Sequence, residues 1–254
     1  MNAGGGDYRI MSHFAIIDSR MSALCKQALR EHGLTLLEIP ENPCYSQPIS
    51  AHPDLFVFPY PNGILVDHSI ASLLEKHLFD GEAFDRSVLF RKESWEERIV
   101  HYPDDCRLNF ALCGHYLIGN PRAMHRELEQ LVQRYGWEII AVRQGYAKCN
   151  ICIVSDNALI TEDIGIAKAC GQKGIDVLFL RTGAVRLAGY PYGFIGGASS
   201  SVVTASDEKQ IFFCGNIFTH PEYERIRDFC RKYNVQVTSL SNEPLQDFGS
   251  VFVL

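Results

Sequence analysis

Residues 108–142 read LNFALCGHYLIGNPRAMHRELEQLVQRYGWEIIAV, and their pattern indicates one complete supersecondary unit. Two short apolar runs flank Gly114-His115, which predicts a β-hairpin. Asn120-Pro121 then has the composition of a helix N-cap followed by the first helical residue. The apolar residues of this helix recur at helical spacing, at Met124, Leu128, Leu131 and Val132. A glycine ends the helix and a third apolar run follows, so the unit is strand, hairpin, strand, helix and strand.

The same order of elements recurs along the chain. Three further complete units lie at 54–90, 150–180 and 200–240, and residues 14–39 form a partial unit that lacks its opening strand. An orphan strand at 250–254 can fill that place, and five units in 254 residues have about 51 residues each. The sequence therefore predicts a five-fold pseudosymmetric α/β propeller of ββαβ units, closed by pairing of the C-terminal strand with the N-terminal unit. The alternative is an open α/β sheet whose units are similar by chance.

Composition limits the possible functions. The chain carries 24 basic and 30 acidic residues, for a formal net charge of -6. This balance argues against a general binder of nucleic acid or of anionic membranes. No apolar run approaches the roughly 18 residues that span a bilayer, and residues 1–12 lack the pattern of a secretory signal. We therefore expect a flexible leader at 1–12, one domain at 13–254 and a cytoplasmic location.

Nine cysteines occur, an odd number in mostly apolar surroundings, which is typical of buried thiols in a reducing compartment. Cys149 and Cys152 form one C-x-x-C, but the run CNICIV predicts a strand on which residues three apart face opposite sides. A second C-x-x-C that would complete a zinc site is absent from the sequence. We therefore expect no metal and no cofactor.

Four segments resemble a known family: AHPD at 51–54, YPDD at 102–105 leading to Asn109, GYAKCNIC at 145–152 and YGFIGGA at 192–198. With the five units, they resemble the pentein fold of arginine deiminases, dimethylarginine dimethylaminohydrolases, amidinotransferases and a ribosome anti-association factor. They are most similar to an uncharacterised bacterial family grouped with these guanidino-modifying enzymes by fold. The resemblance extends from residue 14 to 254 and implies a single pentein-type domain.

The resemblance also implies a chemistry that this chain does not match. Enzymes of the fold use a Cys nucleophile in the opening strand of the last repeat, a His from the preceding repeat, and carboxylates that hold the guanidinium. Here residues 247–254 read DFGSVFVL, without Cys, and residues 195–198 read IGGA, without a carboxylate. We therefore expect that the catalytic set of the superfamily is missing, and that deiminase or amidinotransferase chemistry is absent.

The fold still predicts a site, because the first residues of the opening strands converge on the ring axis. Cys149 beside Lys148 is a candidate thiolate of lowered pKa, and His52 with Asp54 is a candidate oriented base. The ligand-binding candidates are Asn109, Lys148, Asn150, Gly196, Gly197, Asp247 and Ser250. The structural alternative is that His52 and Asp54 cap a turn, that Cys149 packs in the wall, and that Asp247 caps backbone amides. Glycine in the segment 189–197 is expected to allow positive φ or a close approach of backbones near the channel.

Three functions fit these features. The first is binding of a small polar ligand in the central channel without the catalysis of the superfamily. The second is a hydrolase-type enzyme with a rearranged site made of Cys149, His52 and Asp54. The third is a non-catalytic module that binds a protein partner. Fold analogy does not choose among them.

Overall fold

A computed structural model describes residues 14–61, 63–78, 89–90, 99–205 and 208–254. The leader expected at residues 1–12 lies outside the described residues. The described part is a mixed α/β fold with five three-stranded sheets. In each sheet the middle strand pairs antiparallel with the opening strand and parallel with the closing strand. A parallel neighbour requires a crossover connection, and in each unit a helix provides it.

The unit predicted from residues 108–142 is the third along the chain. Its elements are β6 (Ala111–Cys113), β7 (Tyr116–Gly119), α4 (Arg126–Tyr135) and β8 (Glu138–Ala141). The helix begins later than the predicted start at Pro121, because Pro121–Ala123 forms a separate 3₁₀ turn, η4. His125 then caps α4 by accepting a hydrogen bond from the Glu127 amide at Nδ1, and Gly136 ends the helix in the left-handed conformation.

The other four units have the same order. Unit one consists of β15 (Phe252–Val253), β1 (Phe14–Asp18), α1 (Ala23–Glu31) and β2 (Thr35–Ile39). Unit two consists of α2 (Pro53–Phe56), β3 (Val57–Tyr60), β4 (Gly63–Val66), α3 (Ala71–Leu78) and β5 (Leu89–Phe90). Unit four consists of α5 (Ala147–Asn150), β9 (Ile151–Ser155), β10 (Ala158–Thr161), α6 (Ile164–Gln172) and β11 (Asp176–Phe179). Unit five consists of β12 (Val203–Ala205), β13 (Glu208–Phe213), α7 (Tyr223–Lys232) and β14 (Val235–Ser239).

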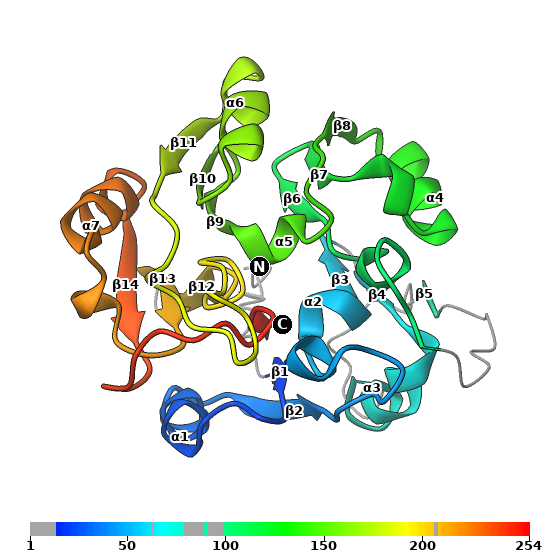
Figure 1. Ribbon diagram of the computed structural model, residues 1–254, viewed down its shortest axis with the longest axis horizontal. Helices are drawn as coiled ribbons and strands as arrows, with labels where there is room; N and C mark the ends of the chain where they lie inside the picture. Colours follow the sequence, from blue (N-terminus) through cyan, green and yellow to red (C-terminus); the bar gives the residue numbers. More distant parts are fainter. Residues whose placement is uncertain (1–13, 62, 79–88, 91–98, 206–207) are drawn as a thin grey trace, which may run out of the picture.

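Four further 3₁₀ turns connect these elements: η1 (Gln47–Ile49), η2 (His68–Ile70), η3 (Asp104–Cys106) and η5 (Ile217–Thr219). Figure 1 shows the five sheets around a common centre, with α1, α4, α6 and α7 at the periphery and the short helices α2 and α5 near the middle. The inner ends of the sheets therefore lie around the middle of the molecule. Among the described residues, no helix is long and apolar enough to cross a membrane.

A local hydrogen bond also repeats in all five units, where the middle strand ends. A side-chain oxygen there accepts from the backbone amide two residues later, which forms an Asx or Ser/Thr turn into the next helix. The pairs are Asp18 with Arg20 (2.7 Å), Asp67 with Ser69 (2.9 Å), Asn120 with Arg122 (3.1 Å), Thr161 with Asp163 (3.2 Å) and Asn216 with Phe218 (3.0 Å). The repeat in the sequence is therefore a repeat of local structure as well.

The predicted pairing of the chain ends is present. Strand β15 runs antiparallel to β1, with Ala15 opposite Val253 and Ile16 opposite Phe252. The Phe14 and Leu254 backbones exchange two hydrogen bonds, of 3.3 and 2.9 Å. The C-terminal strand therefore supplies the strand that the N-terminal unit lacks.

In the described part of the chain the hydrophobic core forms five clusters, and each cluster lies between two neighbouring units. Units one and two share Ile16, Leu37, Val57 and Val66; units two and three share Phe58, Leu65, Leu117 and Trp137; units three and four share Ala111, Ile118, Ile151 and Leu159. Units four and five share Cys152, Ile160, Ile211 and Ile226, and units five and one share Phe212, Leu240, Ala15 and Leu29. Every unit thus packs on the unit before it and the unit after it, and the fifth unit packs on the first.

The starts of the opening strands differ from the prediction. The strands expected at 54–58 and 150–154 begin at Val57 and Ile151, and the residues before them form the one-turn helices α2 and α5. Cys149 therefore lies on a helical turn and not on the strand of Cys152, so the expected strand geometry of this C-x-x-C is wrong. Cys152 instead packs in the apolar cluster between units four and five.

Candidate functional site

Seven of the predicted site residues meet at the centre of the molecule. We call them the central polar cluster: His52, Asp54, Asn109, Lys148, Cys149, Asp247 and Ser250. Each is at least nine-tenths buried, and Asp54, Asn109 and Ser250 have no exposed surface. They come from units two, three and four and from the segment before β15. The predicted convergence of the opening segments is therefore correct, although these residues lie on turns before the strands.

Asn109 joins three of the units. Its Oδ1 accepts hydrogen bonds from the backbone amides of Lys148 (2.7 Å) and Cys149 (3.3 Å). Its Nδ2 lies 3.2 Å from the Asp54 carbonyl oxygen and 3.3 Å from the Cys149 sulfur. A side-chain amide with both ends bound fixes the turn that carries Cys149. Asn109 therefore has a structural role within the cluster.

Asp54 accepts two side-chain hydrogen bonds at one oxygen. The Cys149 thiol lies 3.0 Å and the Ser250 hydroxyl 2.9 Å from Asp54 Oδ2. Ser250 Oγ in turn accepts from Lys148 Nζ at 2.9 Å, and it also lies 3.0 Å from the Gly196 carbonyl oxygen. Ser250 has φ of 71°, in the left-handed region that non-glycine residues rarely adopt. A hydrogen-bonded chain thus runs from the Lys148 ammonium to the Cys149 thiol.

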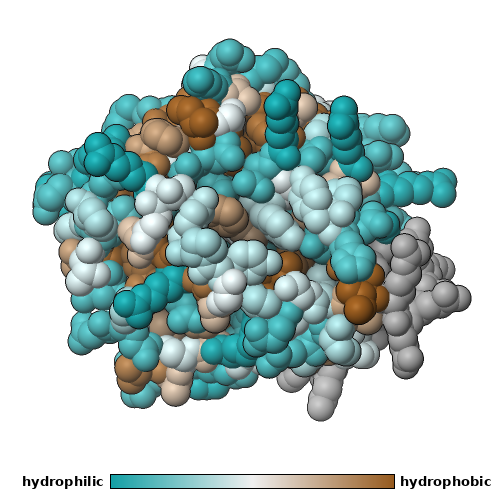
Figure 2. All heavy atoms as spheres, in the orientation of Figure 1, coloured by the Kyte–Doolittle hydropathy of each residue, from teal (hydrophilic) through white to brown (hydrophobic). Residues whose placement is uncertain are grey.

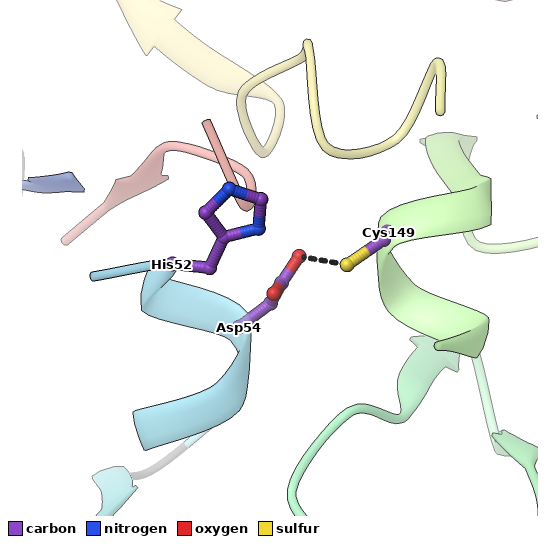
Figure 3. A group of neighbouring side chains, drawn as sticks. All are labelled: His52, Asp54 and Cys149. Carbon is purple, nitrogen blue, oxygen red and sulfur yellow. Dashed lines mark hydrogen bonds between the residues drawn. The ribbon is translucent and has the colours of Figure 1, made fainter. Parts of the chain in front are cut away.

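His52 lies beside Asp54, and Figure 3 shows its ring on the far side of Asp54 from Cys149. Its Nε2 is 4.0 Å from Asp18 Oδ2 and its Nδ1 is 3.9 Å from Asp247 Oδ1. Among the described residues, His52 Nδ1 and Asp54 Oδ1 are buried without a hydrogen-bond partner. The ring therefore lies between two carboxylates, and Asp54, not His52, is the group bonded to the Cys149 thiol.

Asp247 and the glycine-rich segment show the predicted structural alternative. Asp247 accepts from the Phe194 amide at Oδ2 and from the Gly249 amide at Oδ1, each at 2.9 Å, so it caps backbone amides. A Cβ atom on Gly197 would lie 1.9 Å from Asp247 Oδ1. A Cβ atom on Gly196 would lie within 2.6 Å of three backbone carbonyl oxygens. The predicted close approach of backbones is therefore confirmed at Gly196, whereas Gly197 makes room for the Asp247 carboxylate.

Asn150 is the remaining ligand-binding candidate, and it points away from the others. Its Oδ1 accepts a hydrogen bond from Thr161 Oγ1, at 3.3 Å, within unit four. This contact ties α5 to the end of β10. We therefore assign Asn150 to the fold.

The lowered pKa expected for Cys149 is wrong in direction. Burial raises the pKa of the Cys149 thiol well above its ordinary value, and the nearby carboxylates of Asp54 and Asp247 raise it further. Lys148 precedes Cys149 in sequence, but its ammonium bonds Ser250 and not the Cys149 sulfur. Proximity in sequence therefore did not give the electropositive surroundings that a reactive thiolate needs.

The expectation that the chain lacks a Cys/His/carboxylate set also needs correction. His52, Asp54 and Cys149 each offer a donor atom, and these atoms lie within 4.8 Å of one another. The three residues come from units two and four, whereas the enzymes of the fold led us to expect the Cys in the opening strand of the last repeat. The chain therefore does contain such a set, in a different place and with the carboxylate beside the thiol.

Two buried acids of the centre were missed. Asp18 ends β1 and binds Arg20 through both of its oxygens, at 2.9 and 2.6 Å. Glu162 follows β10 and accepts from the Ile195 amide at 2.8 Å, and burial raises its pKa to about 7. Both residues lie at the end of a middle strand, where a side-chain turn repeats in every unit. That repeat is the sequence signal that could have predicted them.

A cavity of about 590 Å³ is lined by residues of all five units. We call it the hairpin pocket, because the β9–β10 turn at Ser155–Asn157 forms part of its lining. Its walls include Phe58 of unit two, Phe110 of unit three, Ile153 of unit four, Ser200 of unit five and Phe252 of unit one. Lys148 also lines it, whereas His52, Asp54 and Cys149 do not. On the face seen in Figure 2, side chains cover the middle of the molecule.

Comparison with known proteins agrees with this architecture. Residues 16–252 match the profile of a family of unknown function, DUF6873. The chain belongs to this family. No curated protein matches it.

Among solved structures, the DUF6873 chain is similar to dimethylarginine dimethylaminohydrolase from Pseudomonas aeruginosa, solved as a Cys-to-Ser mutant with citrulline. The two are 11% identical, with a TM-score of 0.53 over 91% of this chain and 93% of that one. The chain is also similar to agmatine deiminase from C. jejuni, at 9% identity and a TM-score of 0.51, over 91% and 88% of the two chains. These likenesses show the fold. The DUF6873 chain therefore has a mixed α/β fold that resembles the pentein enzymes.

The raised pKa and burial of Cys149 predict low reactivity. In the folded protein, we expect iodoacetamide to modify Cys149 at least about tenfold more slowly than Cys44, because the thiolate is the nucleophile and Cys44 is the partly exposed cysteine. Mass spectrometry of peptides after short exposures measures both rates, and labelling in denaturant controls for intrinsic reactivity. Faster labelling of Cys149 than of Cys44 would contradict the assignment and would revive the rearranged enzyme.

Proposed function

We propose that residues 13–254 of this DUF6873 chain form one closed five-fold α/β propeller of pentein type, which binds a small organic anion in the hairpin pocket. The supporting observation is the pocket itself, a cavity whose lining includes residues of every unit. A site built from all five units is typical of a ligand site at the centre of a ring, and concave, mostly apolar cavities of this size are the usual sites of small molecules.

The charges of the pocket favour an anion. Lys148, Lys209 and Lys232 line it, against the single carboxylate of Asp156. Lys232 is paired with Asp176, at 2.6 Å, so the excess positive charge rests on Lys148 and Lys209. Lys148 is buried in the ring, which reduces solvent screening of its charge. The ligand is therefore expected to place its negative group towards these two lysines.

The walls of the pocket favour a ligand with an apolar body. Aromatic and aliphatic side chains form most of the surface around Lys148: Phe58, Phe110, Leu112, Ile153, Val202 and Phe252. Phe252 lies 5.5 Å from the Lys148 ammonium, measured to the ring centroid, so charge and aromatic surface are adjacent. A carboxylate or sulfonate on a hydrocarbon or aromatic body matches this combination.

The rearranged enzyme is supported less well. A Cys nucleophile needs a base that accepts its proton and a low thiol pKa, whereas Cys149 is buried between carboxylates that raise its pKa. The solved relatives are named as a deiminase and a hydrolase of guanidino compounds, and an equivalent activity here would need a thiolate at the centre. Binding of a protein partner and a cytoplasmic location remain predictions from the sequence.

The anion preference can be tested with two ligands that share one body. We expect 4-phenylbutyrate to bind more tightly than 4-phenylbutylamine, by about fivefold or more, because one favourable ion pair contributes roughly 1 kcal/mol. Isothermal titration calorimetry measures both affinities. Lys148→Met and Lys209→Met should each reduce the difference, and Lys168→Met, at an exposed residue outside the pocket, should not.

Equal affinity for the two ligands, or tighter binding of the amine, would overturn the proposed ligand class. Because Lys148 is part of the buried cluster, its variant can lose stability. Lys209 is exposed, so its variant keeps the test decisive if Lys148→Met does not fold.

A further inference from the structure

The central polar cluster holds a second site that the hairpin pocket does not use. His52 and Asp54 are both at least 98% buried. Among the described residues, His52 Nδ1 and Asp54 Oδ1 have no hydrogen-bond partner. An unpaired buried polar atom costs free energy, so a native structure with two of them side by side calls for a missing partner. Figure 3 shows His52, Asp54 and Cys149 grouped together, with one ring nitrogen of His52 on the side of Asp54.

We propose that His52, Asp54 and Cys149 bind a divalent transition-metal ion of the zinc class. One donor atom from each residue lies within 4.8 Å of the other two, a spacing that lets a single ion reach all three after small side-chain adjustments. An imidazole, a carboxylate and a thiolate are the three ligand types that zinc accepts. The sulfur ligand favours Zn²⁺ or Co²⁺ over Mg²⁺ and Ca²⁺, which take oxygen ligands.

Two of the three ligands are hydrogen-bonded to a residue behind them and the third, His52, faces a carboxylate, a support that metal ligands usually have. His52 Nε2 faces Asp18 Oδ2 at 4.0 Å, and Asp18 is itself fixed by Arg20 at 2.6 Å. Asn109 Nδ2 lies 3.3 Å from the Cys149 sulfur. Ser250 Oγ donates to Asp54 Oδ2 at 2.9 Å. The other oxygen, Asp54 Oδ1, has no hydrogen-bond partner among the described residues and can bind the ion. The arrangement orients a donor from each ligand residue towards the same point.

The charge of the centre also suits a cation. The carboxylates that lie within 4.0 Å of His52 or Cys149 are those of Asp18, Asp54 and Asp247, and they outnumber the nearby cations of Arg20 and Lys148 by one. Buried charge that is not balanced is costly. Binding of the ion removes the proton that the Cys149 thiol shares with Asp54, so the metal–sulfur bond forms, the sulfur–hydrogen bond breaks and one proton leaves to solvent. A divalent ion then balances the added thiolate charge together with the excess carboxylate.

This inference shares only Lys148 with the hairpin pocket, and its test reads the metal directly. The full-length protein is freed of metal with a chelator and titrated with Co²⁺. We expect one Co²⁺ per chain, with the thiolate-to-cobalt charge-transfer absorption and the strong visible bands of a four-coordinate site. Zn²⁺ should displace the cobalt and abolish both signals. In weak buffer, Zn²⁺ addition to the metal-free protein should release about one proton per chain.

Matched variants identify the ligands. Cys149→Ser should remove the charge-transfer band, whereas Cys152→Ala, three residues away and buried in the apolar core, should keep it. Asp18→Asn should weaken Co²⁺ binding by roughly 10- to 100-fold with the band retained, because Asp18 positions His52 without binding the metal itself. Wild-type protein that takes up no Co²⁺, or that gives no thiolate band, overturns the proposal. A charge-transfer band that survives Cys149→Ser also overturns the proposal. If a variant fails to fold, Co²⁺ uptake and the thiolate band of the wild-type protein still test the proposal.

Discussion

Deletion of residues 250–254 should destabilise the protein by about 5 kcal/mol or more, or leave it insoluble. The deletion removes strand β15, and with it the antiparallel partner of β1. Val251 and Phe252 are almost completely buried, and each buried apolar side chain contributes roughly 1.5–3 kcal/mol. The edge of β1 would also be left with unpaired backbone groups, which promotes aggregation.

Phe252→Ala provides a version of this test that keeps the backbone. It should cost about 3–5 kcal/mol, the usual range for a buried Phe-to-Ala change, and urea denaturation with an unchanged slope measures the loss. Phe218→Ala is the matched control, because Phe218 is 54% exposed, and it should change the free energy of unfolding by less than about 1 kcal/mol. A truncated protein with the same denaturation midpoint as the full chain would contradict ring closure by β15.

Gly196→Ala should strongly destabilise the protein. The added Cβ would lie 2.4 Å from the Ile151, 2.5 Å from the Lys148 and 2.6 Å from the Cys149 carbonyl oxygens. These are backbone atoms, so no side chain can rotate away, and the segment around residue 196 must move. We expect a loss of about 3 kcal/mol in the free energy of unfolding.

Gly171→Ala is the control of opposite sign. Gly171 lies in α6, and nothing lies within 4 Å of its added Cβ. Alanine favours a helix over glycine by roughly 0.5–1 kcal/mol, so this variant should be slightly more stable. Equal effects of the two substitutions, measured by urea denaturation, would show that the glycine at 196 is not needed for the close packing of units four and five.

The fold was largely predictable because its signals are local and repeat. The pattern of residues 108–142 identifies one unit, and the missing first strand at the N-terminus together with the extra strand at the C-terminus predicts how the chain ends pair. The one-turn helices α2 and α5 were missed, because four residues are too few for a helical period to be seen. Those turns carry Asp54 and Cys149, so the error fell on the site.

The chemistry of the centre was less predictable, because it depends on contacts between distant residues. Lys148 precedes Cys149 in the chain, yet its ammonium binds Ser250, which is 102 residues away. The carboxylates that raise the pKa of Cys149 come from Asp54 and Asp247, also distant in sequence. The hairpin pocket was missed for a similar reason, because most of its lining lies further along the opening strands and on turns, beyond the first residues of these strands on which the prediction concentrated.

The central claim is that this pentein-type chain works without the thiol chemistry of the guanidino-modifying enzymes. The most direct measurement is the release of ammonia, citrulline or ornithine by the purified full-length protein. The protein and its Cys149→Ser variant are each incubated with agmatine, arginine or methylated arginine between pH 6 and pH 9. We predict no release above the protein-free control for either protein. Product release by the wild type that Cys149→Ser abolishes would contradict the claim and identify the site as a rearranged enzyme.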